Sequence, residues 1–500
     1  MTTPGASRHR SLERALLWIS AVLLVLRVYA SRILGYGDGE ALYAVYALHP
    51  APSYLDHPGL IGALAGLLGD GGAPTPRTAH AWTAVFATTV PFAVLLSARL
   101  AGAPRHRAVE VALVAALTPE LAVGLFGFTP DLPLAILWLL CMGLTLFSLR
   151  RPRGDRRADA ALLAAGVCGG LAAAAKLPGL ALLPWIALSA TGRRPGLVVF
   201  GSVLLGISVV SPVALHEAAS GFAMFRHRFV STQQTAGFSF RNIAALGLGQ
   251  IGYLSPLVFG AAWASARGVI RRRSVDPVAR ALFVLFALTA APLVGLCVWS
   301  RVAEPHWVAP AYLPLAVAWG RRPAALPSWL RDNLLRVAAA FVAVVHLYVL
   351  TDIFPRLAGA SYDGRYDLAN DMRMFPAAAG MLRAELLVAA RGDRRVVVVA
   401  PHWTIAAQLA GVLPSGTLIT TAGGSSSADG DFPRWVSAWT RDRADAVLFV
   451  SDDRFGTGAS EHLTARPTEG RASFTLARGG RPVRRLQLRT LGPPEGAAPP

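Results

Sequence analysis

The chain has 500 residues, of which 54% are hydrophobic and only 15% are charged, and its mean hydropathy is +0.46. Soluble domains carry about 25% charged residues, so this composition argues against a soluble protein and favours a membrane protein. The formal net charge of +19 does not indicate nucleic-acid binding, because the basic residues gather mainly in short clusters between apolar runs.

The first apolar run, residues 15–34, follows three arginines. It is longer than the hydrophobic part of a signal peptide, so we expect an uncleaved first helix. Further apolar runs bring the expected number of transmembrane helices to about 11, although several are shorter than the ~20 residues that cross a bilayer core. These runs are residues 79–100, 108–125, 132–149, 158–175, 177–190, 197–215, 243–266, 281–299, 308–319 and 334–350.

The arginine clusters predict the orientation of the chain. With a cytoplasmic N-terminus, every tight cluster falls on the cytoplasmic side, as the positive-inside rule requires. The clusters lie at residues 105–107, 150–157, 193–194, 271–273 and 321–322. We therefore predict a multi-pass domain over residues 1–351 in the cytoplasmic (inner or plasma) membrane, with residues 35–78 as its first extracytoplasmic loop.

The character of the chain changes after residue 351. Residues 396–400 and 446–450 read as buried strands, residues 404–413 as a helix between them, and residues 473–490 as a hairpin or two strands. An odd number of spans places this part outside. We predict a soluble extracytoplasmic α/β domain over residues 352–490 and a disordered tail over residues 491–500.

The first outer loop carries Asp38, Glu40, Asp56 and His57 within twenty positions. Titratable groups at this density beside a membrane are costly unless they have a function, although acids that merely keep a loop solvated are the simpler explanation. A hydroxyl group is a poor nucleophile, and a positioned carboxylate that removes its proton is the usual help. We predict Asp38 as this base, with Glu40 orienting it or shifting its pKa.

Cationic side chains on the same face could stabilise negative charge that develops during a reaction. Lys176, the single lysine of the chain, lies between two apolar runs, where snorkelling of its ammonium group to the interface is the alternative role. Asp131 follows Pro130 and could cap a helix, with sugar contact as its second role. The other candidates for the cation set are Arg226, Arg228, Arg301 and His306.

Carboxylate and imidazole groups both ligate metals, so a divalent cation could sit between Asp38, Asp56 and His57. No tight metal-binding spacing is present in the sequence, and we expect no required metal or cofactor.

Several motifs resemble those of the GT-C membrane glycosyltransferases, in the branch of bacterial aminoarabinose transferases and protein O-mannosyltransferases. The matching stretches are GDGEALY at 37–43, YLDHPG at 54–59, TPD at 129–131, AKLPG at 175–179, SP at 211–212, GQIGYLSP at 249–256 and EPHWVAPAYLPL at 304–315. The resemblance implies an inverting transferase that takes a sugar from a polyprenyl-phosphate donor at the outer face. The acceptor would be a hydroxyl of a lipid, an envelope glycan or a protein.

The chain departs from the family pattern at two positions. The family commonly has adjacent Asp and Glu residues in the first loop, whereas Gly39 separates Asp38 from Glu40 here. The family also often has Asp-His-Pro-Pro, and the fourth position of this chain is Gly59. The first departure leaves open which of the two acids is the base.

Sidedness favours a lipid-linked donor, because nucleotide sugars are cytoplasmic and the sequence has no P-loop or dinucleotide-binding motif. The main alternative is a transporter or flippase of lipid-linked sugars, which predicts charges deep within the spans. Glu110 and Glu120 are the residues that fit that alternative. A ligase that uses a diphosphate carrier and a non-enzymatic membrane anchor are the remaining alternatives.

Overall fold

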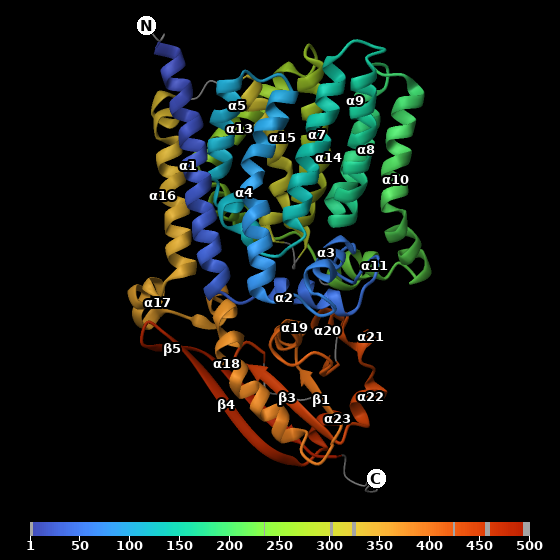
Figure 1. Ribbon diagram of the computed structural model, residues 1–500, viewed down its shortest axis with the longest axis vertical. Helices are drawn as coiled ribbons and strands as arrows, with labels where there is room; N and C mark the ends of the chain where they lie inside the picture. The colour runs from blue at the N-terminus through green and yellow to red at the C-terminus, as the bar shows by residue number, and fades with distance from the viewer. Residues whose placement is uncertain are drawn as a thin grey trace.

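The computed structural model describes residues 4–234, 236–300, 304–322, 327–423, 426–455 and 461–493. Seven of the described helices are long and apolar enough to cross a membrane. They are α1 (Pro4–Ile33), α4 (Pro76–Leu100), α7 (Asp131–Arg150), α8 (Arg156–Ala175), α10 (Gly196–Ala219), α14 (Pro277–Trp299) and α16 (Ser328–Leu350). They form one bundle, and a small sheet domain lies at the end opposite to the N-terminus (Figure 1).

The four other predicted spans are helical but bent or short. The bent pairs are α5 (Arg105–Ala116) with α6 (Pro119–Ala122) and η2 (Gly124–Phe126), at 75°, and α12 (Phe240–Leu254) with α13 (Pro256–Arg272), at 105°. A proline begins the second helix of each pair, and because proline disfavours a helical residue before it, the break falls there. The short segments are η3 (Leu177–Ala181) with α9 (Leu182–Ala190), and η5 (Pro305–Ala311) with α15 (Tyr312–Arg321).

The predicted cytoplasmic connections meet at the end of the bundle that carries the N-terminus. The Arg105 guanidinium lies 2.7 Å from the Glu13 carboxylate on α1, and Arg321 lies 2.9 Å from Asp276. Arg194 donates a hydrogen bond of 3.0 Å to the carbonyl oxygen of Pro152. The arginine clusters therefore occupy one end of the molecule, and that this end faces the cytoplasm stays a prediction.

The first loop, at the other end, folds into two short helices, α2 (Asp38–Val45) and α3 (Leu60–Leu68), with the 3₁₀ turn η1 (Tyr46–Leu48) after α2. Ser53 pairs with Pro58 in a tight turn that carries Asp56 and His57. A Cβ atom on Gly59 would lie 2.3 Å from the carbonyl oxygen of Ala51, so this turn leaves no room for a side chain there. The short helix α11 (Ala223–Phe229) and the turn η4 (Ser231–Gln233) lie at the same end of the bundle (Figure 1).

The C-terminal domain is a five-stranded sheet in the order β2-β1-β3-β5-β4. The strands are β1 (Val396–Ala400), β2 (Leu418–Thr421), β3 (Ala446–Asp452), β4 (Thr468–Arg478) and β5 (Arg481–Leu491). β1 is parallel to β2 and β3, whereas β5 is antiparallel to β3 and β4. The two predicted strands, the helix between them (α19, Trp403–Val412) and the hairpin are confirmed.

The sequence prediction omitted β2, which has only four residues, and α18 (Leu368–Ala389), whose pattern Pro376 interrupts. The predicted tail starts at the last residue of β5, and residues 494–500 lie outside the described residues. The remaining helices of the domain are short. They are α17 (Ile353–Ala358), η6 (Gly359–Ser361), η7 (Gly364–Tyr366), α20 (Ser426–Asp429), α21 (Phe432–Trp435), α22 (Ala438–Asp442) and α23 (Glu461–Thr464).

The first loop and the C-terminal domain share one hydrophobic core. Its buried members from the first loop and from the sheet domain pack together, and include Tyr36, Leu42, Tyr46, Ile61, Phe375, Leu382, Val398, Ile405 and Leu448. Full burial of such a side chain contributes about 1.5–3 kcal/mol, so this core holds the loop and the domain together. The carboxyl ends of β1 and β3 lead into the residues that face the membrane bundle.

Candidate active site

A cavity of about 820 Å³ lies between the helix bundle, the first loop and the C-terminal domain. Most of the candidate residues predicted from the sequence line it, although they come from five separate stretches of the chain. They are Asp38, Glu40, Asp56, His57, Asp131, Lys176, Arg228 and His306. Arg226 is not among the lining residues, and Arg301 lies outside the described residues.

Lys176 and Asp131 form an ion pair in the wall of the cavity. The Lys176 ammonium donates hydrogen bonds of 2.7 and 2.9 Å to the two carboxylate oxygens of Asp131. The N-cap position of α7 is Pro130 and Asp131 is the first helical residue, so Asp131 is not the capping residue that the sequence predicted. The ammonium group has three N–H donors, which leaves at least one for a ligand in the cavity. Lys176 is 7% exposed and does not snorkel to an open surface.

Arg228 of α11 holds the turn that carries Asp56 and His57. Its Nη2 lies 3.1 Å from Asp56 Oδ1 and 3.3 Å from His57 Nε2, and its Nε donates to the Asp56 carbonyl oxygen at 3.1 Å. Burial, and next the charges of Arg228 and Lys176, lower the pKa of His57 well below its ordinary value. His57 is therefore neutral near pH 7 and accepts the hydrogen bond from Arg228.

A third cation–carboxylate pair completes the rim. His306 Nδ1 lies 3.1 Å from the Glu304 carboxylate, and both residues line the cavity. Burial lowers the pKa of His306, but the hydrogen bond to Glu304 and the negative charges of Asp131 and Glu304 together outweigh it, and the pKa lies above its ordinary value. Lys176, Arg228 and His306 thus each lie next to a carboxylate in the wall of the cavity.

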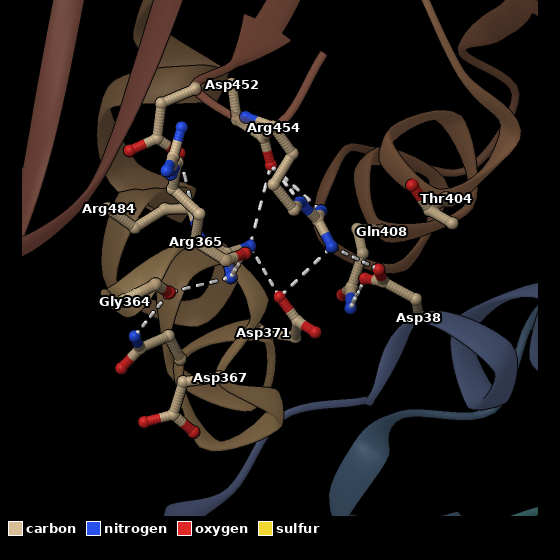
Figure 2. Close-up of polar contacts among 12 residues, drawn as sticks. Asp38, Gly364, Arg365, Asp367, Asp371, Thr404, Gln408, Asp452, Arg454 and Arg484 are labelled. Carbon is tan, nitrogen blue, oxygen red and sulfur yellow. Dashed lines mark hydrogen bonds and ion pairs between the residues drawn. The ribbon is translucent and has the colours of Figure 1, made fainter. Parts of the chain in front are cut away.

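Asp38 begins α2 and lines the cavity at its junction with the C-terminal domain. Arg454 Nη1 lies 2.5 Å from Asp38 Oδ2, and the Gln408 side chain donates to Oδ1 at 3.2 Å (Figure 2). The carboxylate is therefore fixed in place, and both of its partners come from the sheet domain.

Glu40 has a structural task that the sequence prediction did not assign to it. Its carboxylate accepts hydrogen bonds from the backbone N–H groups of Gly37 (2.7 Å) and Phe128 (2.5 Å) and pairs with His80 Nε2 at 2.8 Å. Burial raises the pKa of Glu40, but the His80 pair and these bonds outweigh it and hold the pKa below its ordinary value. The Glu40 side chain is 5% exposed and that of Asp38 is 16% exposed, so the geometry favours Asp38 over Glu40 as a base.

The prediction that Arg226 belongs to the cation set is wrong in this geometry. Arg226 and Arg228 are two positions apart on α11, which puts their side chains on opposite sides of the helix, about 200° apart. Only Arg228 faces the cavity. The sequence does not show where α11 begins, so it could not choose between the two arginines.

The suggested metal site between Asp38, Asp56 and His57 has no support. Among the residues that the structure describes, no three metal-ligating side chains come together. Asp38 is instead paired with Arg454, and Asp56 with Arg228. Two separate arginines thus occupy the positions next to these carboxylates.

The C-terminal domain contributes residues to the cavity that the sequence analysis missed. Asp371 of α18, and His402, Trp403 and Thr404 at the start of α19, line it together with Gly430. A weak signal was available: in open α/β sheets, ligands bind at the carboxyl ends of parallel strands. His402 follows β1 in this way, but the sequence alone does not show that this edge faces the membrane domain.

An apolar groove of about 540 Å³ adjoins the cavity. The cavity and the groove share Asp56, His57, Lys176 and Arg228 as lining residues. The remainder of the groove is mainly apolar and comes largely from α14, with Leu288, Pro292, Leu293, Leu296 and Trp299 among its lining residues. A cavity lined by several charged side chains thus adjoins an apolar groove along a membrane helix.

Comparison with known proteins gives a likeness in structure. No protein-family model matches the chain, and no curated protein sequence matches it. The crystal structure of ArnT from Cupriavidus metallidurans bound to undecaprenyl phosphate has a TM-score of 0.57 at 15% sequence identity, over 97% of this chain and 99% of that one. The apo structure of the same protein gives 0.57 and 15%, over 95% and 97%.

A more distant likeness, with a TM-score of 0.47 and 12% identity, is to the Archaeoglobus fulgidus oligosaccharyltransferase tethered with an acceptor peptide, over 87% of this chain and 68% of that one. The assignment of the fold depends on the two ArnT structures, which the chain matches from the first helix to the sheet domain. ArnT is a GT-C protein. This chain has the GT-C fold, that of a multi-pass membrane protein with a small sheet domain at one end of its helix bundle.

Proposed function

We propose that the chain transfers a sugar, with inversion, from a polyprenyl-phosphate-linked donor to a hydroxyl acceptor in the cavity. The observation that carries the proposal is the junction of this cavity with the apolar groove, at Lys176 and Arg228. A polyprenyl phosphate has the matching chemistry, because an anionic head group is joined to a long apolar chain. The solved structure of ArnT with undecaprenyl phosphate supports this choice of ligand.

Asp38 and the three cationic side chains of the cavity have separate roles in the proposed reaction. Asp38 takes the proton of the acceptor hydroxyl as its oxygen bonds to the anomeric carbon. The bond from that carbon to the phosphate oxygen breaks on the opposite side, and its electron pair stays with the polyprenyl phosphate. Lys176, Arg228 and His306 stabilise the charge that develops on the phosphate, and fixed cations are effective in a site that excludes water.

The test is turnover by the purified protein in proteoliposomes. A panel of labelled polyprenyl-phosphate hexoses and pentoses is compared with the matching nucleotide sugars, with an extract of envelope lipids and glycans as acceptor. We expect free polyprenyl phosphate and a new glycoside from a lipid-linked donor, and release at least about a hundredfold slower with Asp38→Asn. Turnover of nucleotide sugars alone would contradict the proposal.

The same assay separates transfer from transport. Glu110 pairs with Arg107 at 2.7 Å, and Glu120 lines a different cavity of about 80 Å³. Neither residue lines the chamber assigned to transfer. A flippase would move the labelled donor across the membrane and release no free polyprenyl phosphate.

A further inference from the structure

Both carboxylate oxygens of Asp38 are held by the C-terminal domain. Arg454 contacts Oδ2 at 2.5 Å and Gln408 donates to Oδ1 at 3.2 Å, across about four-fifths of the chain (Figure 2). Gln408 also donates to the backbone carbonyl oxygen of Tyr36 at 2.8 Å and is 2% exposed. It therefore fixes the backbone just before α2 as well as the Asp38 side chain.

Arg454 is itself held by two carboxylates of its own domain. Its Nη2 lies 2.8 Å from Asp452 at the end of β3, and its Nη1 lies 3.2 Å from Asp371 on α18. Asp371 also pairs with Arg484 at 2.5 Å (Figure 2). Asp452 and Asp371 therefore hold the Arg454 guanidinium group independently of Asp38. A side chain that positions a catalytic group needs such support from its own neighbours.

A buried hydrophobic core surrounds these contacts. Tyr36 and Leu42 of the first loop belong to the same hydrophobic core as Ile405 of α19 and Leu448 of β3. Because α2 packs on α19 through this core, the distance from Asp38 to its two partners is set by the docking of the whole domain.

We propose that the C-terminal domain takes part in the transfer reaction by holding the Asp38 carboxylate, and that Arg454 and Gln408 are positioning residues for it. This inference depends on the proposed function, since it assigns the residues that act through its base. Arg454 and Gln408 need not touch either substrate. They set the direction in which the carboxylate meets the acceptor hydroxyl, and a misplaced base loses most of its effect.

The test uses the full-length protein in proteoliposomes and measures kcat and the donor KM separately. We expect Gln408→Leu, which removes the hydrogen bonds to Asp38 and to the Tyr36 carbonyl oxygen and keeps the shape of the side chain, to lower kcat about tenfold. Arg454→Gln should lower it about tenfold to a hundredfold, which is no more than the full contribution of a general base. The donor KM should stay within twofold in both variants. Arg454→Lys, which keeps the charge, should recover part of the loss.

Arg478→Gln is the matched control for loss of stability. Arg478 is a buried arginine of the same domain that pairs with Asp352 and Asp367 and does not contact Asp38. It should lower the thermal unfolding temperature in detergent without lowering the kcat of the folded fraction. If Arg454→Gln fails to fold, Gln408→Leu carries the test, because it leaves every ion pair of the cluster in place.

A double-variant comparison separates action through Asp38 from a general effect. In an Asp38→Asn background, Gln408→Leu and Arg454→Gln should cause little further loss, because the group on which they act is already gone. Unchanged kcat in folded Gln408→Leu and Arg454→Gln, or the same fold-loss in both backgrounds, would overturn the inference. Absence of turnover by the unaltered protein with lipid-linked donors would instead refute the proposed function.

Discussion

Asp38 and Glu40 are separated by one residue but differ in what surrounds them. Asp38 faces the cavity and is held by side chains of another domain, whereas Glu40 is 4% exposed and joins three parts of the membrane domain. Their sequence context is nearly the same, because both lie in the first turn of α2. The sequence therefore indicates that both acids are important, but it does not show which one is the base and which one has the structural role.

Substitutions of Glu40 and Asp38 should have different effects on stability and on kcat. Glu40→Gln removes an acceptor from a buried network, and we expect it to lower stability by about 1–3 kcal/mol. The kcat of its folded fraction should stay within a few-fold of normal. Asp38→Asn should do the reverse, with a loss of at least about a hundredfold in kcat and normal thermal unfolding. Thermal unfolding in detergent together with turnover measures both, and a hundredfold loss of kcat in stable Glu40→Gln would move the base to Glu40.

Lys176 should act on the donor. Lys176→Met removes a charged donor from the junction of cavity and groove and leaves Asp131 unpaired. A hydrogen bond to a charged group contributes about 1.5–3 kcal/mol, so the affinity for polyprenyl phosphate should fall about tenfold to a hundredfold. Binding of a fluorescent polyprenyl phosphate checks this, with Lys176→Arg as the control that keeps the charge. If Lys176→Met binds polyprenyl phosphate with the same affinity as the unaltered protein, Lys176 does not bind the donor, and its role is limited to the ion pair with Asp131.

At the scale of elements, helix packing depends on small residues that the hydropathy pattern does not register. A Cβ atom on Gly166 of α8 would lie 1.9 Å from the carbonyl oxygen of Ser202 on α10, and one on Gly170 would lie 2.4 Å from that of Gly206. The four residues thus form a small-residue contact that lets the two backbones approach closely.

This close contact predicts that adding a single methyl group at Gly166 lowers the stability of the protein. Gly166→Ala should force α8 and α10 apart and lower stability by about 1–3 kcal/mol through overpacking. Gly247→Ala on α12 is the matched control, because its Cβ atom meets nothing within 4 Å. Thermal unfolding of the two variants in the same detergent is the measurement. Equal unfolding temperatures would show that α10 is not packed against α8 in this way.

The connection between the first loop and α21 should depend on pH. Asp431 accepts hydrogen bonds from the Leu55 backbone N–H at 3.1 and 3.2 Å. Burial, and next the charge of Asp56, raise its pKa from 3.8 to about 7. Because the folded protein binds this proton more tightly than the unfolded chain, the stabilisation is complete below the ordinary pKa and is lost as the pH rises through about 7.

We therefore expect the unfolding temperature to fall between pH 5 and pH 8, and to fall less in Asp431→Asn, whose amide oxygen can still accept from Leu55. The slope should not vanish in the variant, since burial also raises the pKa of Asp371 to about 7. Thermal unfolding at matched ionic strength is the measurement. The same slope in both proteins would contradict this assignment.

At the scale of the whole molecule, the sequence predicts the membrane bundle, the presence of an α/β domain and most of the residues around the cavity. Apolar runs and arginine clusters are local patterns, and spans follow from them directly. The contact between Asp38 and Arg454 joins residues more than 400 positions apart and depends on a shared core whose members have no common sequence signature. A role for the C-terminal domain could therefore be recognised only in three dimensions.

The central claim is that one chamber joins a carboxylate base to the head group of a lipid-linked donor. A structure of the full-length protein with bound polyprenyl phosphate tests it most directly. We predict the phosphate within hydrogen-bonding distance of Lys176 and Arg228, and the prenyl chain in the groove along Leu293 and Trp299. Binding instead at the other end of the bundle, in the cavity of about 740 Å³ lined by Arg153 and Arg194, would contradict the account.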